Sequence, residues 1–143
     1  MSTVLVFDFG LKRTGVAVGN TIVGTASTVE TLQSVNGKPN WDGISRLIKQ
    51  WSPAKIVVGM PMQLDGTDTP LTDPINKFCN QLNGRYNLPV EQANEQFTSI
   101  EAGRRLKEVR QAGRKKKVSK EDVDQLSAVI IFENWFQSQS PIL

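Results

Sequence analysis

The chain has 143 residues, the usual length of one domain, and we expect a single domain over residues 1–143. It contains no histidine, which excludes Ser-His and Cys-His nucleophilic catalysis and the commonest zinc ligand. The net charge is only +3, and the single cysteine, Cys79, falls in an apolar helical pattern typical of a buried thiol. Any chemistry must therefore come from carboxylates, hydroxyls, lysine or a hard metal ion.

The first half of the chain predicts an antiparallel meander followed by a helix. Residues 3–9 are rich in β-branched and aromatic side chains, and residues 15–19 and 22–29 give two further strand candidates after short turns. Apolar side chains then recur with helical spacing over residues 41–51. This helix is expected to end at Ser52-Pro53.

The second half predicts strands of a parallel sheet. Residues 54–59 (AKIVVG) form a nearly continuous apolar run, typical of a strand buried on both faces, and residues 88–93 form another strand. Helices are expected from a start between Pro70 and Pro74 to a stop at Asn83-Gly84, over 98–110 and over 119–137. Because parallel strands need helical crossovers, we predict an α/β fold with one five-stranded mixed sheet flanked by helices. Three of its strands form the antiparallel meander and two are parallel.

Three carboxylates stand out from this pattern. Asp8 interrupts the apolar first strand, and Glu95 lies just past the strand of residues 88–93. Asp124 falls on the inner face of the last helix, whose start is already capped by Ser119 and Asp122. Ordinary uses remain open, because Asp8 could serve a turn and Glu95 a first helical turn.

If the three carboxylates converge in space, they would repel one another and raise one another's pKa values. One or two Mg²⁺ or Mn²⁺ ions would make such an arrangement favourable, because hard cations prefer carboxylate oxygens. Such ions can activate a water and stabilise the leaving oxygen in phosphodiester cleavage.

Basic residues are concentrated in one segment, because nine of the 17 Lys and Arg residues fall within residues 104–120. Such a local field attracts polyanions, nucleic acid first among them, although a merely solvated segment is the alternative. Lys12 and Arg13 are secondary candidates for phosphate contacts, and they could equally be exposed turn residues. The densest basic run is Arg114, Lys115, Lys116 and Lys117.

The motif around Asp8 also resembles the phosphate loop of the actin, hexokinase and Hsp70-like ATPases, in which turn amides cradle phosphate. That family closes two homologous domains around its nucleotide, whereas this chain has one such motif and no room for a second. No GxxxxGK[ST] or GxGxxG sequence offers a substitute.

Three sets of residues together identify a family: FDFGLKRTGVAVGN (7–20), IVVGMPMQLDGTDTPLT (56–72) with ANEQFTSIEA (93–102), and KEDVDQLSAVIIFENWF (120–136). They resemble the YqgF family, also called RuvX, of pre-16S ribosomal RNA nucleases, formerly described as Holliday junction resolvase-like. The resemblance covers nearly the whole chain. It implies a ribonuclease H-like fold and a cytoplasmic protein that matures the 5′ end of 16S ribosomal RNA.

The resemblance places the family's three acids on Asp8, Glu95 and Asp124. Where the family usually shows Asp-Glu-Arg, this chain has Asn94-Glu95-Gln96, which keeps the glutamate and lacks the flanking acid and arginine.

The prediction is a nuclease that uses Mg²⁺ or Mn²⁺, held by Asp8, Glu95 and Asp124, to hydrolyse RNA in ribosomal precursor particles. Cleavage of DNA junctions and a nucleic-acid-binding role without catalysis remain as alternatives, and both a monomer and a weak homodimer are compatible with the sequence. No stretch approaches the roughly 18 apolar residues of a membrane span, and no secretory signal is recognisable, so we expect a cytoplasmic protein without a membrane contact.

Overall fold

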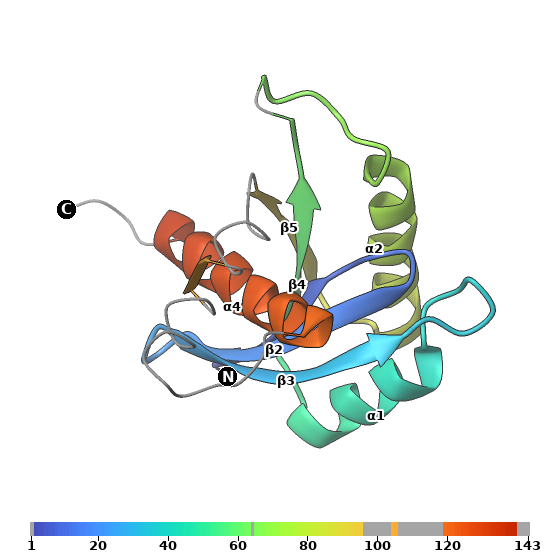
Figure 1. Cartoon of the computed structure of the whole chain (residues 1–143). Coiled ribbons are helices and arrows are strands. Elements are labelled where there is room, and N and C mark those ends of the chain that lie inside the picture. Colours follow the sequence, from blue (N-terminus) through green and yellow to red (C-terminus); the bar gives the residue numbers. More distant parts are fainter. Residues whose placement is uncertain (1, 64, 96–103, 106–118, 140–143) are drawn as a thin grey trace.

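One five-stranded sheet in the order β3-β2-β1-β4-β5 organises the computed structural model (Figure 1). The structure describes residues 2–63, 65–95, 104–105 and 119–139. The first three strands pair antiparallel, and β4 and β5 run parallel to β1. The predicted α/β fold with its mixed sheet is confirmed. The strands are β1 (Thr3–Asp8), β2 (Arg13–Asn20), β3 (Thr25–Gln33), β4 (Lys55–Pro61) and β5 (Val90–Glu95).

Helices cover both faces of this sheet. Helices α1 (Trp41–Trp51) and α2 (Thr72–Tyr86) lie against one face, and α4 (Lys120–Gln139) crosses the other (Figure 1). The helix expected over residues 98–110 lies largely outside the described residues. Among the described helices, none has the length and apolar character needed to cross a membrane.

Helix α2 ends later than the sequence predicts. It continues through Gly84 to Tyr86, and Asn87 ends it in the left-handed conformation, with φ of 54°. Glycine inside a helix costs only about 1 kcal/mol relative to alanine, so buried apolar side chains such as Leu82 can carry the helix past it. The expected stop at Asn83-Gly84 is therefore wrong.

Strand β1 lies at the centre of the sheet and is buried on both faces. Leu5 and Phe7 pack in the core under α1 and α2, whereas Val4 and Val6 pack in the core under α4. Side chains alternate between the faces of a strand, so Asp8 continues the row of Val4 and Val6. The acid therefore lies on the α4 side of the sheet, at the carboxyl end of β1.

Glycines in the sheet allow α4 to pack unusually close. A Cβ added to the backbone would lie 2.1 Å from an α4 atom at Gly15, 2.3 Å at Gly19 and 2.4 Å at Gly59. On the helix side, Ser127 and Ala128 are small and fully buried. The position of α4 over β2 and β4 is thus set by residues that lack a side chain.

The turn between β2 and β3 exposes two large apolar side chains, Ile22 at 82% and Val23 at 69% of their surface. Phe136 of α4 packs beneath this turn, 2.7 Å from the ideal Cβ position of Gly24, whose φ of +84° suits glycine. The carboxyl-terminal half of α4 is therefore anchored to the sheet by apolar contacts.

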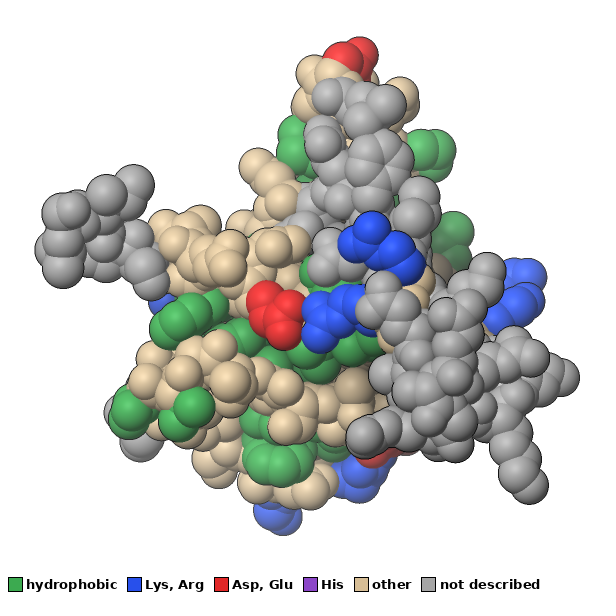
Figure 2. Space-filling model, turned by 60° about the vertical axis from the view of Figure 1, so that its left-hand side comes forward, with side chains coloured by type: hydrophobic (Ala, Val, Ile, Leu, Met, Phe, Trp, Pro, Cys, Tyr) green, Lys and Arg blue, Asp and Glu red, His purple; other side chains and the backbone are tan. Residues whose placement is uncertain are grey.

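In Figure 2, apolar side chains reach the surface on the face shown, and acidic and basic side chains lie next to one another.

Candidate active site

Two of the three candidate acids lie at the same edge of the sheet. Asp8 is the last residue of β1, and Glu95 is the last residue of β5 instead of lying just past the strand. Strands β1, β4 and β5 are parallel, so their carboxyl ends meet at one edge, where open α/β sheets gather their ligands. The side chain of Glu95 lies outside the described part of the structure.

Asp124 reaches the same place from helix α4. Ser119 caps the helix as predicted: its Oγ accepts from the Asp122 amide at 3.1 Å, and its own amide donates to Asp122 Oδ2 at 3.2 Å. The backbone of Asp124 lies over Gly15, which is the partner of Asp8 in the β1–β2 ladder. The structure thus brings Asp8 and Asp124 together across a single glycine.

The surroundings of Asp8 and Asp124 disfavour the ionised form of both carboxyl groups. Burial raises the pKa of Asp8 to about 7, the carboxylate of Asp124 raises it further, and Arg13 acts in the opposite direction. Burial also raises the pKa of Asp124, against the hydrogen bond and charge of Arg13, with Glu121 adding to the rise. Two acids in such a setting are favourable places for a cation.

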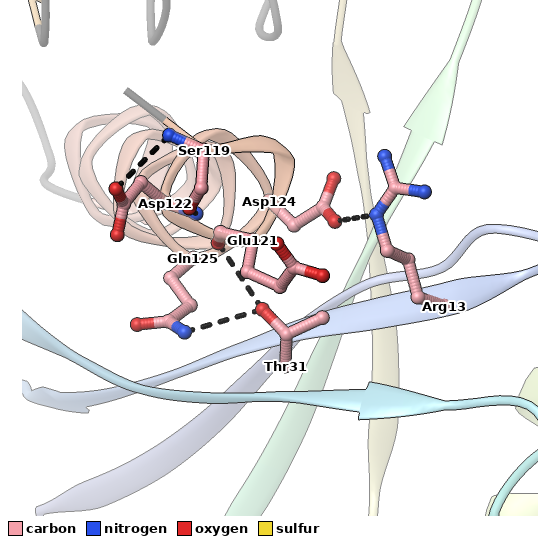
Figure 3. Close-up of polar contacts among 7 residues, drawn as sticks. All are labelled: Arg13, Thr31, Ser119, Glu121, Asp122, Asp124 and Gln125. Carbon is pink, nitrogen blue, oxygen red and sulfur yellow. Dashed lines mark hydrogen bonds and ion pairs between the residues drawn. The ribbon is translucent and has the colours of Figure 1, made fainter. Parts of the chain in front are cut away.

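Arg13 is the counter-charge of this site. It opens β2, and its Nε donates a hydrogen bond to Asp124 Oδ2 in a half-buried ion pair (Figure 3). The side chain of Arg13 is 27% exposed, so the residue is not an ordinary exposed turn residue. Lys12, by contrast, is exposed in the β1–β2 turn, and residues 114–117 with their four basic side chains lie outside the described residues.

A shallow pocket of about 330 Å³ opens beside the ion pair. It gives solvent and a ligand access to Asp124 and Arg13, and Lys12 adds a second positive charge. A basic, open pocket next to carboxylates can accept a phosphate group. Its lining is Gly10, Leu11, Lys12, Arg13, Leu71 and Asp124.

Within the described residues, no group of three or more carboxylate or cysteine side chains is placed to hold a metal ion. Asp8 and Asp124 supply two carboxylates, which are the hard oxygen ligands that Mg²⁺ and Mn²⁺ prefer. The buried, raised-pKa carboxyl of Asp8 beside a second acid fits a divalent cation.

Two features of the site were missed by sequence reasoning. Thr31 of β3 donates to the Glu121 carbonyl at 3.1 Å and accepts from Gln125 Nε2 at 3.2 Å, which tethers the first turns of α4 (Figure 3). No sequence signal links residues about 90 positions apart. The close approach at Gly15 had a signal, because a glycine inside a strand often marks a near backbone.

Comparison with known proteins decides the family. The family model described as "RuvX: Holliday junction resolvase" matches residues 2–138. The chain belongs to the RuvX family. The family predicted from the sequence is thus confirmed. The predicted enzyme class, a hydrolase of phosphodiester bonds, is confirmed by this family membership.

Relatives of this RuvX protein match it over almost their whole length. A protein of Actinobacillus pleuropneumoniae serotype 7 (strain AP76), named "Putative pre-16S rRNA nuclease", is 45% identical over 137 residues, covering 96% of this chain and 98% of that protein. A protein of Glaesserella parasuis serovar 5 (strain SH0165) with the same name is 46% identical over 138 residues, with the same coverage.

Solved structures show the same fold at low identity. The yeast mitochondrial Holliday junction resolvase Ydc2 superposes with a TM-score of 0.57, 12% identity, and coverage of 95% of this chain and 78% of that one. RuvC of T. thermophilus, in complex with a Holliday junction substrate, superposes with a TM-score of 0.54, 12% identity, and coverage of 99% and 100%. The predicted ribonuclease H-like fold is confirmed.

Proposed function

We propose that this RuvX protein is a metal-dependent nuclease that hydrolyses RNA and processes the 5′ end of pre-16S ribosomal RNA in the cytoplasm. The observation that carries the proposal is the pairing of Asp8 and Asp124 across Gly15 at the carboxyl edge of the sheet. Burial raises the pKa of Asp8 to about 7, so its ionised form needs a nearby cation.

Asp8, Asp124 and Glu95 would hold Mg²⁺ or Mn²⁺ in this proposal. When bound, the cation supplies an activated water and stabilises the leaving oxygen of the phosphodiester. Arg13 keeps Asp124 in place through its hydrogen bond and brings a positive charge to the pocket that receives the phosphate. Thr31 fixes the start of α4, and with it the direction from which Asp124 approaches the substrate.

The RNA substrate is proposed from the name of the relatives, "Putative pre-16S rRNA nuclease". Lys12 and the basic residues Arg114, Lys115, Lys116 and Lys117 would contact the phosphate backbone. Phosphate contacts position a nucleic acid but carry no direct sequence information. The family description, Holliday junction resolvase, makes cleavage of a DNA junction the second candidate function.

Cleavage of a 5′-extended pre-16S RNA fragment by the purified protein in Mg²⁺ or Mn²⁺ tests the proposal. Asp8→Asn and Asp124→Asn are each expected to slow cleavage about 100-fold or more while RNA binding is retained, because a carboxylate that holds the cation is lost. Asp42→Asn, a matched change at an exposed position of α1, should leave the rate unchanged.

A four-way DNA junction in the same assay separates the two substrates. Cleavage of the RNA but not of the junction supports the proposed function, and the reverse result supports the resolvase. Equal activity of the wild type and both variants would end the nuclease proposal at these residues and favour a binding role without catalysis.

A further inference from the structure

A larger groove lies on the other face of the sheet, between the start of α1 and helix α2. Its volume is about 560 Å³, within the usual range for small-ligand sites. Three aromatic side chains form its inner wall: the rings of Phe9 and Phe78 are 4.7 Å apart, and those of Trp41 and Phe78 are 5.7 Å apart. The groove therefore has an aromatic inner wall.

The rim of this groove is basic. Lys38, Lys77 and Arg85 line it against a single acid, Asp73, and all four residues are exposed. The Arg85 guanidinium carbon lies 4.0 Å from the ring centroid of Trp41, so a planar cation covers the indole. Flat rings with an excess of positive charge complement a ligand that is both planar and anionic.

The groove adjoins the candidate active site. Leu11 lines both the groove and the pocket beside Asp124, and it is 61% exposed. Phe9 of the groove directly follows Asp8 in the chain, on the opposite side of the sheet edge. A polymer bound at the carboxylates therefore reaches the groove by passing over Leu11.

We propose that this groove binds an unpaired nucleobase of the RNA next to the phosphate that is cleaved. Nucleobases stack on arginine planes as well as on aromatic rings, and the Arg85 guanidinium that lies over Trp41 offers such a plane here. Lys38 and Lys77 would contact the flanking phosphates. The inference rests on the proposed function, because it uses the carboxylate site as the place of cleavage.

Fluorescence anisotropy with labelled single-stranded RNA of about ten nucleotides, in metal-free buffer, tests base binding. One nucleotide at a time is replaced by an abasic residue, and the affinities of the wild type and Trp41→Leu are compared as a double-mutant cycle. One abasic position should lower the RNA affinity of the wild type about tenfold, which is the effect expected from the loss of one stacked base. The same abasic position should lower the RNA affinity of Trp41→Leu less than about twofold.

Charge reversal gives a second test that leaves Trp41 intact. Lys77→Glu in the groove should weaken RNA binding about tenfold, whereas Lys49→Glu, which changes another exposed lysine outside the groove, should alter binding less than about twofold. Far-UV circular dichroism shows whether each variant is folded. If Trp41→Leu does not fold, the comparison of Lys77→Glu with Lys49→Glu decides whether the groove binds RNA.

The outcomes separate this inference from the proposed function. The wild type could cleave RNA while no abasic position is coupled to Trp41 and the two lysine variants have equal effects. That result overturns the groove as a base-binding site and agrees with the proposed nuclease. Coupling at one position without cleavage supports the groove and contradicts the catalytic proposal. Absence of RNA binding by the wild type overturns the groove.

Discussion

The carbonyl oxygen of Asp124 lies only 2.1 Å from the position that a Cβ of Gly15 would occupy. Gly15 is also the partner of Asp8 in the β1–β2 ladder, so one residue without a side chain separates the two acids. The short distance from the sheet to α4 at this point brings Asp124 to the end of β1. The geometry of the site therefore depends on Gly15.

Gly15→Ala should damage both stability and activity. The new methyl group would overlap the helix backbone, which cannot rotate away as a side chain can, so α4 must move. We expect a loss of about 1–3 kcal/mol in the free energy of unfolding, as for overpacked cores. Displacement of Asp124 by about 1 Å should slow RNA cleavage about 100-fold.

Gly84→Ala in α2 is the matched control for this change. Among the described residues, no atom lies within 4 Å of its ideal Cβ, and the residue is inside a helix. The variant should be stabilised by about 0.5–1 kcal/mol in urea denaturation and should cleave RNA as the wild type does. If Gly15→Ala also kept wild-type cleavage, close packing at residue 15 would not set the site.

The raised pKa of Asp8 predicts how stability depends on pH without metal. Between the ordinary carboxyl pKa of 3.8 and the raised pKa of about 7, the folded protein binds more protons than the unfolded chain. The free energy of unfolding should therefore fall as pH rises through this window. Asp8→Asn removes the effect, so in EDTA it should be more stable than the wild type at pH 8, by at most about 4 kcal/mol, and nearly equal at pH 3.5.

Asp65→Asn is a control with the opposite sign. Thr67 donates two hydrogen bonds to Asp65, from its amide at 3.0 Å and its hydroxyl at 2.6 Å, and these lower the pKa of this exposed acid. Asp65 therefore stabilises the protein above its unfolded pKa, and that contribution is lost as pH falls. If Asp8→Asn and the wild type had parallel pH profiles, the carboxyl of Asp8 would not be desolvated as described.

Arg13 should compete with a divalent cation for Asp124. Its guanidinium donates to Asp124 Oδ2, so a cation must approach against a positive charge. Arg13→Gln should bind Mn²⁺ about tenfold more tightly in calorimetric titration without RNA, the equivalent of about 1.4 kcal/mol. Arg46→Gln, which removes a remote arginine paired with Glu30 at 2.8 Å, should leave Mn²⁺ affinity unchanged. Weaker Mn²⁺ binding by Arg13→Gln would show that Arg13 supports the ion instead.

The basic run should determine the salt dependence of RNA binding. Replacing Arg114, Lys115, Lys116 and Lys117 together by alanine removes up to four phosphate contacts. The slope of log K against log salt should become less steep by about 3, because each contact to a single strand contributes about 0.7. Filter binding over a series of salt concentrations measures this slope, and an unchanged slope would place the RNA elsewhere on the protein.

Local signals in the sequence were sufficient for most of the fold. The apolar run of β1 and the helical spacing of α1 each reflect burial of one segment, and the capping pair Ser119 and Asp122 marks the start of α4. The helical spacing of Asp124 with Ser127, Ala128 and Ile131 predicts its placement on the inner face of α4. The end of α2 could not, since packing of the whole helix outweighs the local cost of Gly84.

Contacts between distant segments were the part that the sequence could not predict. The ion pair of Arg13 with Asp124 joins residues 111 positions apart, and no periodicity of either segment indicates it. Glu95 illustrates a smaller limit, because strand pairing with Pro61 extends β5 by two residues beyond the end of the predicted strand, residue 93. Such pairing is decided by the neighbouring strand. The roles of Asp8, Glu95 and Asp124 in metal binding stay predictions.

A crystal structure of the protein soaked with Mn²⁺ shows whether Asp8 and Asp124 hold the ion, because the anomalous signal of manganese locates it. We expect manganese in contact with carboxylate oxygens of both Asp8 and Asp124, and its loss from the site in Asp8→Asn crystals. Manganese bound elsewhere, with Asp124 still paired to Arg13 and Asp8 without the ion at saturating concentration, would contradict this expectation.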